Sequence, residues 1–148
     1  FLNMDENVNI VSSDANNEDK LTSISVLIIE DDLFLVRLLE KRFAEANIKT
    51  IVAFGAGEAA PILEKEHIDA LLLDILLPDV DGISFLRELR KNPKFANLPV
   101  VIISNLGQKD DVKKGLDAGA DSYLIKADTD TDEIISVLNK AIKNHQQG

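Results

Sequence analysis

The centre of the chain reads Leu71-Leu72-Leu73-Asp74-Ile75-Leu76-Leu77-Pro78-Asp79-Val80-Asp81-Gly82. An apolar run of strand length ends in a carboxylate, Asp74, and a proline and an Asp-Gly pair then turn the chain. A buried parallel strand is a nearly continuous run of branched aliphatic residues, so an ionisable residue at its carboxyl end contributes little to packing. Asp74 is therefore the first candidate for chemistry, although a single aspartate at a strand end can also serve as a helix cap or turn residue.

A second apolar run, residues 26–29, ends in Glu30 and Asp31 and continues directly into a helical pattern. In an open parallel sheet, neighbouring strands lie about 4.8 Å apart, and their carboxyl ends share the edge where ligands bind. If the two strands are adjacent, Glu30, Asp31 and Asp74 form one acidic cluster, whose like charges repel unless a cation lies among them. Oxygen ligands without a nearby Cys or His suit a hard divalent ion, most simply Mg²⁺.

Composition narrows the function classes. The length of 148 residues predicts one domain, and a hydrophobic content of 45% is enough for a core. The absence of cysteine excludes disulfides, thiolate metal sites and cysteine nucleophiles. A net charge of −10 argues against binding to nucleic acid or to an anionic membrane. No apolar run approaches the length of a membrane span and no signal-peptide pattern opens the chain, so we expect a cytoplasmic protein.

The first 23 residues differ from the rest of the chain. They are rich in Asn, Asp, Ser and Glu and show no sustained periodicity. A segment of this kind buries too little apolar surface to offset its ordering entropy, so we interpret residues 1–23 as a flexible leader or expression remnant. The folded domain is expected to span residues 24–148.

From residue 24 onward, strand and helix patterns alternate five times. The predicted strands are residues 25–30, 50–54, 69–74, 100–103 and 121–125, and the predicted helices are residues 32–46, 57–66, 83–91, 109–118 and 130–144. Strict alternation predicts an α/β fold, a single doubly wound (βα)5 domain with a parallel five-stranded sheet, helices on both faces and right-handed crossovers.

Two further polar residues fall at strand ends. The fourth strand ends in Ser104 and the fifth in Lys126. Three carboxylates, a hydroxyl and an ammonium suit a phosphoryl group, because a carboxylate can attack phosphorus while Mg²⁺ and lysine neutralise the transferring oxygens. Taken singly, Lys126 reads as a solvated surface lysine, Ser104 as a helix cap and Tyr123 as a packing aromatic. Their joint position at strand ends favours the site.

With these residues identified, residues 24–145 resemble a response-regulator receiver domain of two-component signalling. The resemblance implies a flavodoxin-like fold with strand order 2-1-3-4-5. It also implies Asp74 as the phosphoacceptor, Glu30 and Asp31 as the acidic metal pair, and the backbone carbonyl of Leu76 as a further Mg²⁺ ligand. By the same resemblance Ser104 is the switch hydroxyl, Lys126 is the lysine of the family motif, and Tyr123 is the aromatic that changes rotamer on activation. Pro78, Asp81 and Gly82 match the turn after the phosphoacceptor strand.

The chain departs from this family pattern at several positions. Ala127 follows Lys126 where the family usually has a proline with a cis bond, and a cis bond without proline costs roughly 2.5–4 kcal/mol. We therefore expect a trans bond and a shifted loop from Ala127 to Thr131. Asn105 is larger and more polar than the small residue usual after the switch hydroxyl. Leu76 and Leu106 are apolar where related domains carry water-positioning side chains, which predicts slow autodephosphorylation.

The resulting expectation is a stand-alone signalling receiver rather than an enzyme. A histidine kinase or phosphotransfer protein would phosphorylate Asp74. The output would be binding of a downstream protein to the face formed by the fourth helix, the fifth strand and the fifth helix, by a monomer or a phosphorylation-dependent dimer. The alternative is a degenerate receiver that binds partners without phosphorylation. A haloacid-type phosphatase would need a second Asp where Leu76 stands, and an FMN carrier would need a Ser/Thr-rich loop after the first strand.

Overall fold

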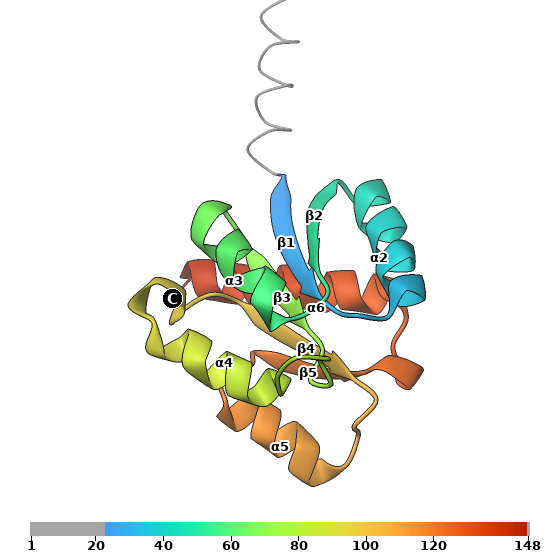
Figure 1. Cartoon of the computed structure of the whole chain (residues 1–148). Helices are drawn as coiled ribbons and strands as arrows, with labels where there is room; N and C mark the ends of the chain where they lie inside the picture. The colour runs from blue at the N-terminus through green and yellow to red at the C-terminus, as the bar shows by residue number, and fades with distance from the viewer. Residues whose placement is uncertain (1–22, 148) are drawn as a thin grey trace, which may run out of the picture.

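The computed structural model describes residues 23–147, in which five parallel strands form one sheet (Figure 1). The strands are β1 (Ile24–Ile29), β2 (Ile48–Ala53), β3 (Ala70–Leu73), β4 (Val100–Ser104) and β5 (Ser122–Ile125). Their order across the sheet is β2-β1-β3-β4-β5, which confirms the predicted topology. The predicted leader lies, except for its last residue, outside the described residues and stays a prediction.

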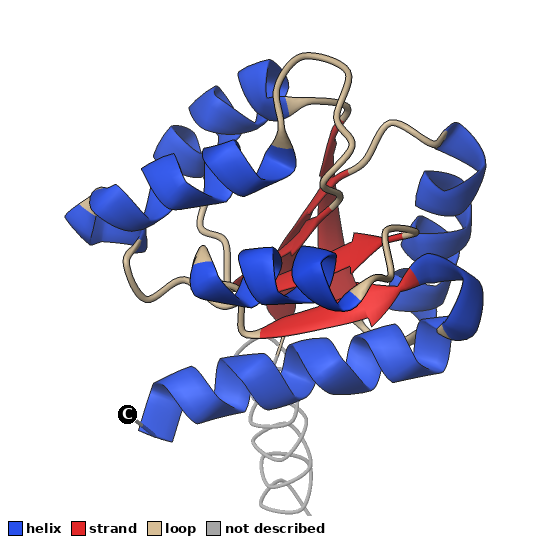
Figure 2. Ribbon diagram, turned by 90° about the horizontal axis from the view of Figure 1, so that it is seen from below, coloured by secondary structure: helices blue, strands red, loops and turns tan. Residues whose placement is uncertain are grey.

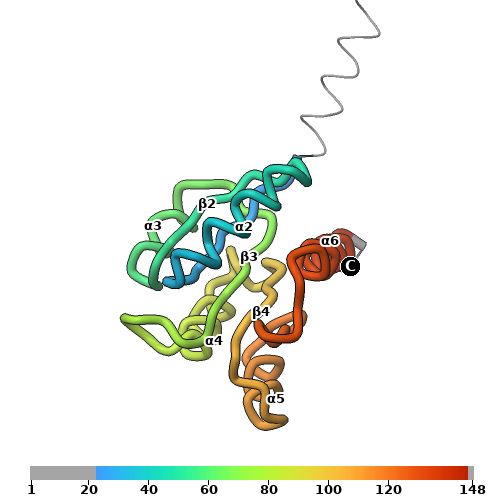
Figure 3. Tube along the Cα trace, turned by 90° about the vertical axis from the view of Figure 1, so that its right-hand side faces the viewer, coloured from blue at the N-terminus to red at the C-terminus, as the bar shows by residue number. Residues whose placement is uncertain are grey.

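Helices cover both faces of the sheet (Figure 2). They are α2 (Leu33–Glu45), α3 (Ala56–Lys65), α4 (Gly82–Lys91), α5 (Lys109–Asp117) and α6 (Thr131–Gln147), with short 3-10 helices η1 (Pro93–Phe95) and η2 (Lys126–Asp128). Figure 3 places α3 and α4 on one side of β3 and α6 on the other. Within residues 23–147, no helix has the length and apolar character needed to cross a membrane.

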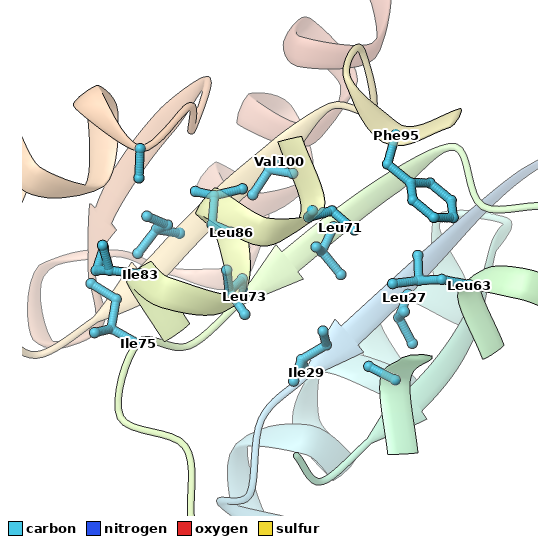
Figure 4. Close-up of a cluster of buried hydrophobic side chains, with 14 of the residues drawn as sticks. Leu27, Ile29, Leu63, Leu71, Leu73, Ile75, Ile83, Leu86, Phe95 and Val100 are labelled. Atoms are coloured by element: carbon cyan, nitrogen blue, oxygen red, sulfur yellow. The ribbon is translucent and has the colours of Figure 1, made fainter. Parts of the chain in front are cut away.

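The core forms two layers because side chains alternate between the faces of each strand. Leu27, Ile29, Leu71 and Leu73 point into one cluster with α3 and α4 (Figure 4). Their neighbours along the same strands point into a second cluster with α2 and α6. All four residues of β3 are fully buried. Full burial of a leucine side chain is worth about 1.5–3 kcal/mol, so the central strand is firmly held and its last residue has a fixed position.

Aspartates set the start of the two helices that follow the acidic strand ends. Asp32 accepts hydrogen bonds from the backbone N–H groups of Phe34 and Leu35 at the start of α2. Asp81 caps α4 in the same way. Because a side-chain cap satisfies N–H groups that have no partner within the helix, each helix begins directly after its capping aspartate.

The structure shifts most predicted boundaries by one residue, and α6 ends at Gln147, three residues beyond its predicted end. β2 begins at Ile48 and not at residue 50, because Asn47 adopts a positive φ of 62° and turns the chain directly into register with β1, where Ile48 pairs with Ile24. After β5, the 3-10 helix η2 forms the first part of the loop that was predicted from Ala127 to Thr131. The described residues contain no cis peptide bond, so the predicted trans bond before Ala127 is confirmed.

Candidate functional site

The carboxyl edge of the sheet brings the ends of β1 and β3 together. Ile29 pairs with Leu73, and the backbone N–H of Asp74 donates to the carbonyl oxygen of Ile29 at 3.0 Å. Glu30 and Asp74 therefore follow adjacent strands at the same height. β1 and β3 also flank the point where the winding of the sheet reverses, which is the usual ligand-binding crevice of such a fold.

The acidic cluster that the sequence predicts is present at this edge. Glu30, Asp31 and Asp74 each offer a carboxylate oxygen, and these atoms lie within 4.8 Å of one another. Glu30 is only 1% exposed and Asp74 is 4% exposed, whereas Asp31 lies at the surface. The cluster therefore has a buried floor of two carboxylates and one exposed carboxylate at its entrance.

Lys126, which follows β5, supplies the positive charge of the cluster. Its Nζ lies 2.6 Å from Glu30 Oε1 and 3.1 Å from Asp74 Oδ2. Burial alone would lower the pKa of Lys126, but the contacts with the two carboxylates outweigh burial and raise that pKa. Burial raises the pKa of Glu30, and the charge of Asp74 adds to this effect, although the contacts with Lys126 and the Asp32 N–H act in the opposite direction. Lys126 is therefore firmly protonated and lies between two carboxylates.

The charges and donor atoms fit a divalent cation. Three carboxylates and one ammonium leave a formal charge of −2. Within the described part of the chain, Glu30 Oε1 has no well-directed hydrogen bond, because its close contact with Lys126 is an ion pair without hydrogen-bond geometry. An all-oxygen donor set with two excess negative charges suits Mg²⁺.

The loop between β3 and α4 holds Asp74 closely. Asp74 Oδ1 accepts the N–H of Leu76 at 3.3 Å, and the N–H of Gly82 donates to the carbonyl of Ile75 at 2.8 Å. A Cβ atom at Gly82 would lie 2.6 Å from the backbone oxygen of Asp74, so only glycine fits at this close approach. Asp74, the candidate phosphoacceptor, is thus held through its side chain by the N–H of Leu76, and its backbone is packed closely against Gly82.

Ser104 and Tyr123 meet at one backbone segment, Leu106. Ser104 is fully buried, and its Oγ accepts the N–H of Leu106 at 3.1 Å. The hydroxyl of Tyr123 donates to the carbonyl of Leu106 at 2.5 Å. Burial raises the pKa of Tyr123, so this phenol stays protonated and remains a donor at neutral pH. No hydrogen bond joins Ser104 to Asp74 within residues 23–147, and Asn105 lies at the surface.

Exposed apolar residues lie on the segments that follow β1, β2 and β3, at the same edge of the sheet as the acidic cluster, and we call them the apolar rim. Within residues 23–147, six of the seven large hydrophobic residues that are exposed lie on α2 or on the loops after β2 and β3: Leu33, Phe34, Leu38, Phe54, Leu76 and Val80. Phe34 is the most exposed of them at 81%. Exposed apolar residues gathered around a site are typical of protein contact surfaces.

Comparison with known proteins identifies the family. The model of the response regulator receiver domain matches residues 26–139. The chain belongs to this family. The receiver domain is 35% identical to the receiver domain of the Francisella response regulator 1452, with a TM-score of 0.75 over 82% of this chain and 98% of that one. This likeness agrees with the flavodoxin-like fold and the strand order described above.

Curated relatives of the receiver domain are longer proteins. It is 32% identical over 101 residues to a probable transcriptional regulator, ycf27, of Cyanophora paradoxa, covering 68% of this chain and 41% of that protein. It is 30% identical over 115 residues to a gliding motility regulatory protein of Myxococcus xanthus, covering 77% of this chain and 15% of that protein. The chain thus spans less than half the length of these two relatives.

The structure brings together most of the residues singled out from the sequence, but it also adds features that the sequence reasoning missed. Glu30, Asp31 and Asp74 offer oxygens within 4.8 Å of one another, and Lys126 pairs with Glu30 and Asp74. The link from Ser104 to Tyr123 through the backbone of Leu106 was not foreseen, because a backbone partner leaves no trace in residue identity. The apolar rim could have been found in the sequence, because Leu33 and Phe34 are apolar at the start of a helix whose buried face is formed by other positions.

The position of Lys126 generates a prediction on stability. The variant Lys126→Met keeps the apolar stem and removes the charge, so two buried carboxylates lose their cation. In metal-free buffer at pH 7, we expect the free energy of unfolding to fall by about 2–3 kcal/mol in urea titrations, below the full cost of breaking a buried pair because the ammonium is partly exposed.

The loss of unfolding free energy in Lys126→Met should depend on pH. The pKa of Glu30 is raised in the folded state, so its ionisation disfavours folding once the pH rises above the ordinary glutamate value of about 4.3. The deficit of Lys126→Met should therefore shrink as the pH falls toward that value. The control Lys113→Met, which breaks an exposed ion pair with Asp117, should leave stability nearly unchanged. A deficit independent of pH would contradict this account.

Proposed function

We propose that the receiver domain is a phosphorylation-dependent signalling switch in which Asp74 accepts the phosphoryl group. The observation that supports this most strongly is the buried Asp74 carboxylate held between Lys126 and the acidic pair at the sheet edge, in a chain that belongs to the receiver family. The donor would be a histidine kinase or a histidine phosphotransfer protein.

The transfer is a displacement at phosphorus. A carboxylate oxygen of Asp74 attacks the phosphorus of a phosphohistidine, the P–N bond breaks, and its electron pair leaves on the imidazole nitrogen. The products are an acyl phosphate on Asp74 and an unmodified histidine. Lys126 lies beside Asp74 Oδ2, where its ammonium can neutralise charge on the transferring oxygens.

A magnesium ion would be held by Glu30, Asp31, Asp74 and the backbone carbonyl of Leu76. When bound, Mg²⁺ supplies positive charge that lowers the repulsion between the carboxylates and the incoming phosphoryl oxygens. The side chains prepare this site in the folded protein, since the formal charge of −2 at the cluster attracts a divalent cation.

The switch would act through the loop after β4. Ser104 and Tyr123 both hold Leu106, so a hydroxyl that turns toward a phosphoryl group on Asp74 changes the hydrogen bond that positions this loop. The loop leads into α5, and Tyr123 belongs to β5. The proposed result is a population shift of the face formed by α5, β5 and α6, which binds a downstream protein.

The apolar rim would receive the phosphodonor. Asp74 is 4% exposed at the same edge of the sheet as this rim, so a protein that brings a phosphohistidine within reach of it must cover residues of that edge. Phe34 and Leu33 precede the buried part of α2 and are the parts of the rim nearest to Asp31 in sequence. The donor is therefore expected to present an apolar surface around its histidine.

A mass measurement tests the phosphoacceptor. Incubation with acetyl phosphate and Mg²⁺ should add about 80 Da, the mass of one phosphoryl group, to the wild-type chain. Asp74→Ala should gain no mass, whereas Asp117→Ala on the surface of α5 should behave like the wild type. A wild-type chain that remains unmodified would favour the degenerate receiver, which binds partners without phosphorylation.

The lifetime of the acyl phosphate tests the role of the two leucines. Leu76 and Leu106 line the same cavity of about 320 Å³ between the loop after β3, α4 and α5. Without a polar side chain at either position to orient water, we expect a half-life of minutes or longer. Leu76→Asn should shorten it about tenfold, equivalent to about 1.4 kcal/mol of activation free energy, and Leu116→Asn outside the cavity should not. A wild-type half-life of seconds would refute the proposal.

A comparison of two phosphodonors tests the apolar rim. Phe34→Ser should slow phosphorylation by a purified phosphotransfer protein that modifies the wild type, because a protein donor has to dock on the rim. The same variant should accept phosphate from acetyl phosphate at the wild-type rate, since a small molecule needs no docking surface. Lys41→Ser, an exposed position further along α2, is the matched control for both donors. Equal slowing with both donors would show that Phe34 affects the site itself.

A further inference from the structure

The loop between β3 and α4 carries the carbonyl of Leu76 through a largely exposed segment. Leu76 and residues 78–80 lie at the surface, with Leu76 60% exposed. Most backbone contacts of this loop are local. Leu76 forms a β-bridge with Asp81, and the N–H groups of Leu77 and Gly82 both donate to the carbonyl oxygen of Ile75. These contacts shape the loop but join it only to itself and to the start of α4. A carbonyl that binds a metal from an exposed loop needs an anchor to another element.

Asp79 provides that anchor. Its Oδ1 accepts the N–H of Ala56 at 3.1 Å and its Oδ2 accepts the N–H of Gly57 at 2.8 Å. Both donors belong to the first turn of α3, whose own N-cap position, Gly55, has no side chain to satisfy them. The hydrogen bonds from Gly57 and Ala56 lower the pKa of Asp79, so the carboxylate is charged at neutral pH. The cap of α3 thus comes from a loop more than twenty residues away in sequence.

Gly55, the residue before α3, leaves room for the carboxylate of Asp79. A Cβ atom at Gly55 would lie 2.8 Å from Asp79 Oδ1, closer than side chains tolerate. The φ of Gly55 is −170°, an extended conformation open to any residue. Backbone conformation therefore does not require glycine here. The space left by the missing side chain is the space that the Asp79 carboxylate occupies.

We propose that Asp79 is a positioning residue that locks the loop after β3 onto α3 and so holds the Leu76 carbonyl in its metal-binding place. This inference rests on the proposed function, because it assigns a support to the metal site of that function. Without the anchor, the loop still folds through its local contacts but samples more positions. The carbonyl is then offered to the metal only part of the time, and the apparent affinity for Mg²⁺ falls in proportion.

The test compares two residues that stabilise the same helix start. Glu58 accepts the N–H of Phe54 at 2.6 Å, so it also supports the beginning of α3, but within residues 23–147 it has no hydrogen bond to the loop after β3. Titration of Mg²⁺ by calorimetry should show roughly tenfold weaker binding for Asp79→Ala, the size expected when a supporting contact of a metal ligand is removed. Glu58→Ala should bind Mg²⁺ like the wild type. Asp79→Asn, whose amide oxygen can accept one of the two N–H groups, should fall between them.

A double-variant experiment identifies the contact itself. Gly55→Ala should weaken Mg²⁺ binding as Asp79→Ala does, because its methyl group displaces the carboxylate. In an Asp79→Ala background the same change should have little further effect, since the collision no longer exists. Amide hydrogen exchange of residues 75–81 in the metal-free protein should be faster in Asp79→Ala and unchanged in Glu58→Ala. Equal effects of the Asp79 and Glu58 variants, or no effect of either, would overturn the proposal.

The failure of this proposal is distinguishable from failure of the proposed function. If the wild type binds Mg²⁺ but takes up no phosphoryl group from acetyl phosphate, the phosphoacceptor assignment fails while the Mg²⁺ titrations still report on Asp79. If the wild type is phosphorylated and the Asp79 variant binds Mg²⁺ normally, the function stands and the positioning role is refuted.

Discussion

The balance of charge between two buried carboxylates and one lysine governs this molecule. Burying Glu30 and Asp74 at the end of adjacent strands is costly, and the ammonium of Lys126 offsets that cost only in part. The excess negative charge that remains suits a divalent cation, and it is the basis on which we propose phosphoryl chemistry at this edge of the sheet. Without the parallel register of β1 and β3, the carboxylates would not share this edge, and without Lys126 they would lose the ammonium that contacts both of them.

The loops around this charged centre divide into a fixed side and a movable side. On the fixed side, the loop after β3 is clamped by Gly82 against the backbone of Asp74 and by Asp79 against α3. On the other side, the loop after β4 is held by hydrogen bonds from Leu106 to Ser104 and from Tyr123 to Leu106. Hydroxyl groups can exchange partners at small cost. In the proposed switch, the loop after β3 would keep the metal-binding geometry while the loop after β4 changes position.

The apolar rim and the charged centre serve different parts of recognition. The rim offers apolar area at the sheet edge that also carries the acidic cluster. Apolar area supplies contact energy with little directional preference, whereas the buried charges select the chemical group that can enter. In the proposed function, this surface would accept a protein donor and still leave a small phosphodonor free to reach Asp74.

The amino-acid sequence alone was enough for the order of strands and helices and for the acidic cluster. An apolar run that ends in Glu30 or Asp74 indicates a buried strand, and the carboxylate marks where that strand ends. In a parallel sheet all such ends lie on one edge. The trans bond before Ala127 was also predictable, because it follows from the local chemistry of the peptide bond. The start of β2 was not, since it depends on the left-handed turn at Asn47 and on pairing with β1.

Only the tertiary structure decided which polar groups meet across the fold. Asp79 looks like an ordinary turn residue in sequence, yet its carboxylate caps a helix that begins more than twenty positions earlier. Leu106 looks like a purely apolar neighbour of the site, yet its backbone joins the switch hydroxyl to the tyrosine. Residue identity reveals burial and local turns because these depend on each side chain and its neighbours. Hydrogen bonds between distant loops depend on where packing of the whole core places them, and that information is spread over the entire chain.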